Sequence, residues 1–302
     1  MGHDHAHGLR AESRRRLALV LGTTTAVMLV EVIGARVTGS LALLADAGHM
    51  LTDAAGLLIA LIALGLASRP ATPNRSFGYA RLEILSALLN ATVLFVVAIL
   101  VLVEAWSRWQ ATPHIEAGLM LAFACVGAVT NTVGILVLRA GAKHSLNVRG
   151  AYLEVLGDLL GSLATIVSAI VILRTGWQRA DVVASVLVAC MIVPRALSLL
   201  RETVDILLEA APKGVDVAEV RRHILEAPGV IDVHDLHAWT ISSGLPVFSA
   251  HVVVDDGLAD IGAAQRLLTH LATCLADNFA LEHCTIQVEL SAFAATEAHE
   301  HP

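Results

Sequence analysis

The sequence predicts a helical membrane domain followed by a small soluble α+β domain. First, 56% of the 302 residues are hydrophobic and 16% are charged, well below the roughly 25% of charged residues in soluble domains. Second, six long apolar segments precede residue 208, and each is long enough to cross a bilayer core of about 30 Å. Third, the sequence after Glu209 changes to short stretches of alternating apolar and polar residues.

These observations divide the chain into four predicted parts. They are a His-containing cytosolic tail over residues 1–16, a six-helix transmembrane domain over 17–208, a cytosolic αββαβ domain over 209–291, and a disordered tail over 292–302.

The six apolar segments are predicted to be transmembrane helices. They lie at residues 17–37, 41–67, 82–108, 117–138, 151–174 and 181–202. Pro194 and Arg195 interrupt the sixth, where we expect a kink and an arginine that snorkels to the interface. An even number of spans places both termini on one side of the membrane. Ten basic residues lie in segments on that side and four lie opposite, so the positive-inside rule predicts cytosolic termini.

The soluble part is predicted to fold as helix, strand, strand, helix and strand. The predicted elements are a helix from Asp216 to about 227, strands at 230–241 and 246–254, a helix capped by Asp260, and a strand at 284–290. Capping residues and period-two alternation support these assignments. So short a domain buries only a modest core, and pairing with a second copy would stabilise it.

Two polar stretches interrupt the second and fifth apolar segments. The first places Asp46, His49 and Asp53 at helical positions i, i+3 and i+7. The second places Glu154 and Asp158 at i and i+4. Each stretch therefore follows one helix face. Inserting each of these charged groups into a bilayer costs on the order of 3 kcal/mol of free energy. We predict a divalent-cation site of one imidazole and three carboxylates. Hydrogen bonds between helices and a water-filled vestibule are the alternatives.

Four motifs resemble the cation diffusion facilitator family. They are Ser40–Asp53, Phe77–Ile84, Asn147–Asp158 and His234–Trp239, in the family's order. The resemblance covers about residues 10–290 and is strongest to the bacterial zinc/cobalt/cadmium-type efflux transporters. It implies a homodimer with six spans per protomer, a metallochaperone-like cytosolic domain, and export of Zn²⁺ from the cytosol in exchange for protons.

The resemblance also implies a transport site. Its matching positions are His49, Asp53, Glu154 and Asp158, with Asp46 as an accessory group. Glu154 stands where zinc-transporting members usually have histidine. It supplies a harder oxygen ligand and an extra negative charge. Zn²⁺ remains the expected ion because His49 is present, with Cd²⁺ or Co²⁺ as further candidates.

A second metal site is implied in the cytosolic domain. The matching positions are His234, His251 and Glu289, with His237 and His283 as accessory groups. Gln287 occupies a position that is often histidine in relatives. Zinc bound there would regulate transport or brace the dimer, whereas half-exposed histidines without a metal are the alternative.

Arg81 matches a basic residue that joins a charge interlock at the base of the family's dimer. Glu209 is its expected acidic partner, and a snorkelling arginine is the alternative. The loop from Ser68 to Ser76 contains no histidine or acidic residue, so the additional zinc site of some bacterial relatives is expected to be absent. Short loops without a long His-rich insert favour a bacterial inner membrane over a vesicle membrane.

The functional prediction is therefore a proton-coupled antiporter of divalent cations that is not an enzyme and needs no cofactor. Its expected partners are the cations, protons, membrane lipid and a second copy. Residues 211–302 hold 13 of the 27 acidic residues but 4 of the 20 basic ones, which argues against nucleic-acid binding. A membrane-anchored metal sensor and a channel are alternatives. An intramembrane metalloprotease is a weaker one, because the HExxH motif is missing.

Overall fold

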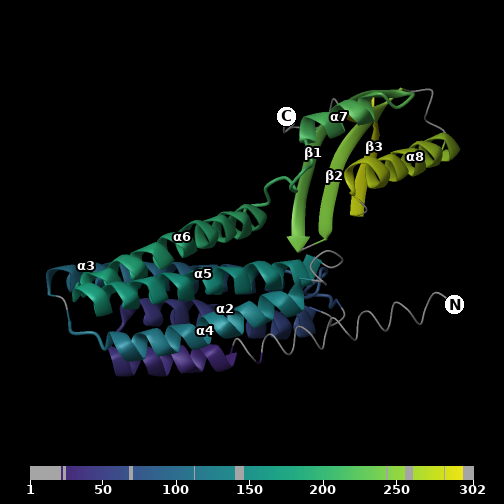
Figure 1. Cartoon of the computed structure of the whole chain (residues 1–302). Helices are drawn as coiled ribbons and strands as arrows, with labels where there is room; N and C mark the ends of the chain where they lie inside the picture. The colour runs from purple at the N-terminus through teal and green to yellow at the C-terminus, as the bar shows by residue number, and fades with distance from the viewer. Residues whose placement is uncertain are drawn as a thin grey trace, which may run out of the picture. The chain divides into compact units, whose positions relative to one another are not determined.

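The computed structural model describes residues 22, 25–67, 71–111, 113–139, 146–242, 244–255, 261–281 and 283–294. They divide into two compact units, whose elements are labelled in Figure 1. One contains the described residues up to Ile59 together with Leu89–Leu200. The other contains Ala60–Leu88 and the described residues from Arg201 onward. The predicted N-terminal tail and the capping residue Asp260 lie outside the described residues.

Long apolar helices build the first part of the chain. A helix over residues 25–38 precedes α2 (Leu41–Ala67), α3 (Leu82–Gln110), α4 (Ala117–Leu138), α5 (Leu146–Thr175) and α6 (Arg179–Leu207). Within the described residues, α3, α4, the Tyr152–Thr175 part of α5, and α6 are each long and apolar enough to cross a membrane. Large apolar side chains such as Trp106, Val129 and Val167 are exposed on them, as expected for surfaces that face lipid. The count of six spans remains a prediction.

Small residues form the contacts between these helices. One buried cluster joins Ala42 of α2, Ala124 of α4, Ala169 of α5 and Ala184 of α6. A second cluster joins α2, α3 and α6 through alanines and a few larger residues such as Leu94. Small side chains let helix backbones approach closely, which is how helices pack where lipid is as apolar as the helices themselves. Close packing brings polar groups on different helices within reach of one another.

Asp181, at the start of α6, fixes the beginning of α2. Its buried carboxylate accepts hydrogen bonds from the Ser40 hydroxyl and from the backbone amides of Leu41 (2.7 Å) and Ala42 (3.2 Å). These are among the first amides of α2, which have no partner within the helix. The contact ties the N-terminus of α2 to α6 and so sets where the polar face of α2 lies.

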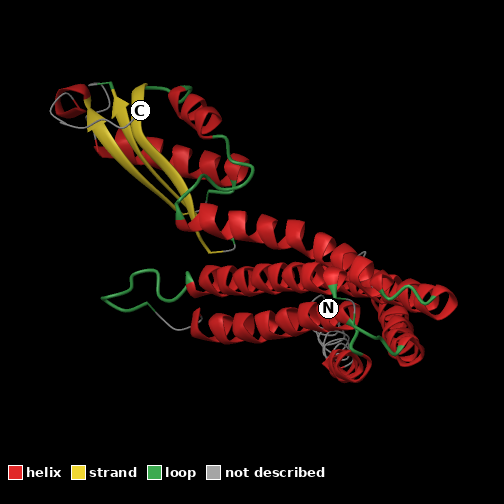
Figure 2. Cartoon of the chain, turned by 90° about the vertical axis from the view of Figure 1, so that its left-hand side faces the viewer, coloured by secondary structure: helices red, strands yellow, loops and turns green. Residues whose placement is uncertain are grey.

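The soluble domain has the predicted αββαβ order. Its elements are α7 (Val217–Leu225), β1 (Val230–Ser242), β2 (Leu245–Val254), α8 (Ile261–Phe279) and β3 (His283–Leu290). The strands form one sheet in the order β1-β2-β3, antiparallel between β1 and β2 and parallel between β2 and β3, and they lie side by side in Figure 2. The prediction for the tail was wrong at its beginning, because the chain forms the short helix α9 (Ser291–Ala294), which contacts β2 and β3.

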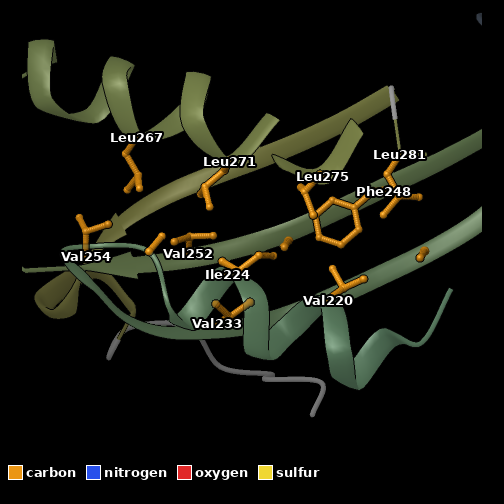
Figure 3. Packing of buried hydrophobic residues seen from close by; sticks show 13 residues of the cluster. Val220, Ile224, Val233, Phe248, Val252, Val254, Leu267, Leu271, Leu275 and Leu281 are labelled. Carbon is orange, nitrogen blue, oxygen red and sulfur yellow. The ribbon is translucent and has the colours of Figure 1, made fainter. Parts of the chain in front are cut away.

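Both long helices of this domain cover the same face of the sheet. Alternate residues of β2 from Phe248 to Val254 belong to one buried cluster with Ile224 of α7 and with Leu271 and Leu275 of α8, as Figure 3 shows. Because side chains alternate along a strand, His251 of β2 points to the opposite face. His251 therefore lies on the face of the sheet that α7 and α8 do not cover.

Candidate metal sites

Three of the predicted transport-site residues meet inside the helical bundle. His49 and Asp53 are one turn apart on α2, with His49 Nε2 at 3.5 Å from Asp53 Oδ2. Asp158 on α5 places Oδ1 at 3.9 Å from the same nitrogen. His49 and Asp158 are buried and Asp53 is half-buried. The arrangement offers one imidazole nitrogen and two carboxylates to a cation.

Glu154, the fourth predicted ligand, contacts an arginine. Arg195 of α6 donates from Nη2 to Glu154 Oε1 at 2.7 Å, and its Nη1 lies 4.0 Å from Asp53 Oδ2. Snorkelling of Arg195 to the interface stays a prediction, and within the protein its guanidinium pairs with Glu154. α6 continues as a helix through Pro194 and carries the guanidinium to the acidic cluster. Arg195 thus supplies a positive charge to the side of the cluster where Glu154 adds a negative one.

Asp46 lies one turn from His49 on α2 and is buried, and its polar neighbours include Glu31 and Ser162. A Cβ atom at Gly161 of α5 would lie 2.7 Å from Asp46 Oδ1. Near it is Glu31, a fully buried acid on the helix over 25–38 that our reading of the sequence missed. The same signal that marked Asp46, an acid inside an apolar segment, would have identified Glu31.

The predicted cytosolic residues form a tighter group. His234 of β1 pairs with His251 of β2 across the antiparallel ladder, and their ring centroids are 5.2 Å apart. Glu289 of β3 reaches both rings, with Oε2 at 3.3 Å from His234 Nε2 and Oε1 at 2.9 Å from His251 Nδ1. One ligand atom from each residue lies within 4.8 Å of the other two. Among the described residues, no other group of three or more His, Cys, Asp or Glu reaches this closeness.

Gln287 and the two predicted accessory residues, His237 and His283, lie differently around this group. Gln287 donates from Nε2 to Glu289 Oε1 at 2.7 Å, so its amide orients the carboxylate. His237 contacts Asp235 at 3.2 Å, and Asp235 in turn lies 4.0 Å from His251. His283 does not join the group within one chain. It begins β3 opposite Val247, four residues along β2 from His251, and its ring contacts Phe77.

Arg81 and Glu209 form an ion pair, with Nη2 at 2.8 Å from Oε1. Both side chains are exposed, and such a pair contributes roughly 0–1 kcal/mol to folding. Its geometry is compatible with the predicted interlock, and its role between protomers remains a prediction.

Comparison with known proteins identifies the family. The cation efflux transmembrane domain model matches residues 17–208, and the model of the cation efflux protein cytoplasmic domain matches residues 212–291. The metal cation efflux system protein CzcD of Cupriavidus metallidurans is 43% identical over 301 residues, covering 100% of this chain and 94% of the relative. The zinc transporter ZitB of Escherichia coli is 41% identical over 305 residues, covering 99% and 96%.

Two further similar proteins are a full-length transporter and a separate domain. The cadmium, cobalt and zinc/H(+)-K(+) antiporter of Bacillus subtilis is 38% identical over 303 residues, covering 100% of this chain and 94% of the relative. A solved structure of the metal-bound C-terminal domain of the CzcD transporter matches 25% of this chain and 100% of its own, with 43% identity and a TM-score of 0.23. With both family models spanning most of the sequence and full-length relatives that efflux metal cations, the chain belongs to the cation efflux, or cation diffusion facilitator, family of metal transporters.

Proposed function

We propose that the protein exports divalent metal cations from the cytosol in exchange for protons, with Zn²⁺ as its main substrate. The observation that carries this proposal is the group of His49, Asp53 and Asp158, which converge from α2 and α5 inside an apolar bundle. Unpaired charges in such a place are costly, and a divalent cation offsets that cost while it is bound.

Coupling to protons follows from competition at the same atoms. A carboxylate or imidazole that carries a proton on its ligand atom cannot hold a metal ion, so metal binding releases protons and protonation expels metal. Rocking of the helices between inward-facing and outward-facing states would complete the cycle. The Bacillus subtilis relative is named as an antiporter of protons and potassium, which supports exchange over a channel mechanism.

The donor set favours Zn²⁺ and leaves room for its neighbours. The imidazole of His49 suits zinc and cobalt, whereas the carboxylates of Asp53, Asp158 and Glu154 accept harder ions as well. Glu154 must leave Arg195 before it can bind a metal. We infer that Cd²⁺ and Co²⁺ are also transported, and that Glu154 tunes their ranking relative to Zn²⁺.

The cytosolic domain would regulate this transport. His234, His251 and Glu289 offer two nitrogens and a carboxylate on the sheet face that α7 and α8 do not cover. We propose that zinc binds there when cytosolic zinc rises, and that the protein works as a homodimer. We also propose that it crosses the bacterial inner membrane six times with both termini in the cytosol.

Transport by purified protein in liposomes tests the main proposal. Zn²⁺ uptake, read by an internal fluorescent chelator, should rise when a pH gradient is imposed and should fall to background in Asp158→Asn. Glu116→Gln, which alters an exposed carboxylate outside the cluster, serves as the matched control. Uptake that ignores the pH gradient, or that survives Asp158→Asn unchanged, would refute the proposal.

A metal sensor is the second candidate, because the cytosolic group is the more compact of the two. In that case His251→Ala would abolish the response of cells to zinc, and Asp158→Asn would leave metal tolerance intact. The transporter proposal makes the reverse prediction for Asp158→Asn, so growth on zinc separates the two candidates.

A further inference from the structure

A second group of buried polar side chains lies one helical turn beyond the transport cluster. On α2, Asp46 precedes His49 by three residues, and on α5, Ser162 follows Asp158 by four. Such spacings place each next to its cluster neighbour on the same helix face. Glu31 joins them from the helix over 25–38. The exposed fractions of Glu31, Asp46 and Ser162 are 0%, 2% and 1%, so bulk water does not reach them.

Two glycines allow these oxygens to come together. A Cβ atom at Gly127 of α4 would lie 2.6 Å from Glu31 Oε1 and 3.0 Å from Ser162 Oγ. A Cβ atom at Gly161 of α5 would lie 2.7 Å from Asp46 Oδ1. Any larger residue at either position would push into the polar group. The carboxylate of Glu31 and the hydroxyl of Ser162 therefore both lie against Gly127 of α4.

The oxygens of this group are not satisfied by the protein. Both Oε atoms of Glu31 have no hydrogen-bond partner among the residues that the structure describes, and the Ser162 hydroxyl faces the Asp46 carboxylate. The Glu31 and Asp46 carboxylates lie close enough to repel each other when both are charged. Buried carboxylates without a compensating charge are strongly unfavourable. An unpartnered, fully buried carboxylate beside a second carboxylate and a hydroxyl is the donor pattern of a cation site.

We propose that Glu31, Asp46 and Ser162 bind a divalent cation through oxygen atoms alone, as a second station beyond the transport site. This step rests on the proposed export function. The group lacks an imidazole or thiolate, so it prefers harder ions than the site at His49 does. Its two carboxylates match the charge of one divalent ion. Asp158, which interacts electrostatically with both Asp46 and Asp53, provides the oxygen through which an ion passes from one station to the next.

The test measures Cd²⁺ binding to the full-length protein after the two histidine-containing sites have been disabled by substitution. The background variant carries His49→Ala and Asp53→Ala in the membrane and His251→Ala in the cytosolic domain. Equilibrium binding should still find one Cd²⁺ per protomer, and cadmium NMR should give the chemical shift of an all-oxygen ligand set. Added to this background, Glu31→Gln should weaken binding by more than about tenfold, at least as much as loss of a supporting residue at other metal sites.

A pair of glycine variants controls for folding and for charge. Gly127→Ala adds one methyl group between Glu31 and Ser162 and should also weaken Cd²⁺ binding. Gly118→Ala, on the same helix, meets nothing within 4 Å and should leave binding unchanged. Size-exclusion chromatography verifies that each variant is folded.

Two results would overturn the proposal. One is that the background variant binds no Cd²⁺ with an all-oxygen signature, which would mean that these carboxylates hold only protons. The other is that Glu31→Gln and Gly127→Ala leave the remaining Cd²⁺ unaffected. Failure of the export function is a separate outcome, because it is read from uptake by wild-type liposomes. Absent uptake with intact all-oxygen binding would refute export and keep the site.

Discussion

Arg195→Met is expected to tighten metal binding at the transmembrane cluster. Arg195 donates to Glu154 at 2.7 Å and lies 4.0 Å from Asp53, so a metal ion that uses either carboxylate must displace a guanidinium. Methionine keeps much of the side-chain length and apolar stem of arginine but removes the charge. The variant therefore leaves Glu154 and Asp53 free to bind the metal.

The size of the expected change in metal affinity follows from how exposed the interacting side chains are. The side chains of Arg195 and Glu154 are 48% and 45% exposed, and an ion pair at such a position contributes roughly 0.2–1 kcal/mol. Attraction between Arg195 and Asp53 at their separation of 4.0 Å adds about 1 kcal/mol with water-like screening. Removal of both should lower the Kd for metal by roughly five- to thirtyfold, which corresponds to about 1–2 kcal/mol.

The assay is competition with a fluorescent zinc chelator in a His251→Ala background, which disables the cytosolic site. Arg201→Met, an exposed arginine on the same helix, should leave the Kd unchanged. If Glu154 binds the metal once Arg195 no longer holds it, Glu154→Gln should weaken metal binding more in the Arg195→Met background than in protein that keeps Arg195. A Kd that stays constant or rises in Arg195→Met would refute the view that Arg195 competes with the metal.

Three further substitutions probe the regulatory site, the core and the helix anchor. Glu289→Gln should weaken Zn²⁺ binding to the cytosolic group by at least about tenfold, because the charged oxygen that reaches His251 is lost. Calorimetry on a variant without the transmembrane ligands measures this effect. Phe248→Ala, at a fully buried position, should destabilise the soluble domain by about 3–5 kcal/mol, seen as faster hydrogen exchange in β2. Asp181→Ala removes the acceptor for the first amides of α2 and should cost about 1–2 kcal/mol, seen as earlier thermal unfolding in detergent.

Each of these has a matched control at an exposed position. Glu219→Gln should leave Zn²⁺ binding intact, Ile261→Ala should leave exchange in β2 slow, and Asp205→Ala should leave thermal unfolding unchanged. Unaltered zinc affinity in Glu289→Gln would exclude that carboxylate as a ligand. Unaltered exchange in Phe248→Ala, or unaltered unfolding in Asp181→Ala, would contradict the packing and capping arguments.

The helices and strands were predicted well because each depends mainly on consecutive residues of the sequence. The apolar run at residues 117–138 coincides with α4, since run length and helix formation depend on the same consecutive residues. The strands at 230–241 and 246–254 end within one residue of β1 and β2, since period-two alternation reflects which side of a strand each residue faces. The helix α9 was missed because a single short turn carries no periodic signal.

The sequence by itself determined the ligand pairs on single helices. His49 and Asp53 had to share a face of α2 once that segment was helical, because a helix repeats every 3.6 residues. Only the tertiary structure decided which groups meet across elements. Arg195 reaches Glu154, Glu31 reaches the neighbourhood of Asp46, and strand register separates His283 from its expected group. Such contacts depend on how helices rotate and approach through their small residues and on strand pairing, which no single segment encodes.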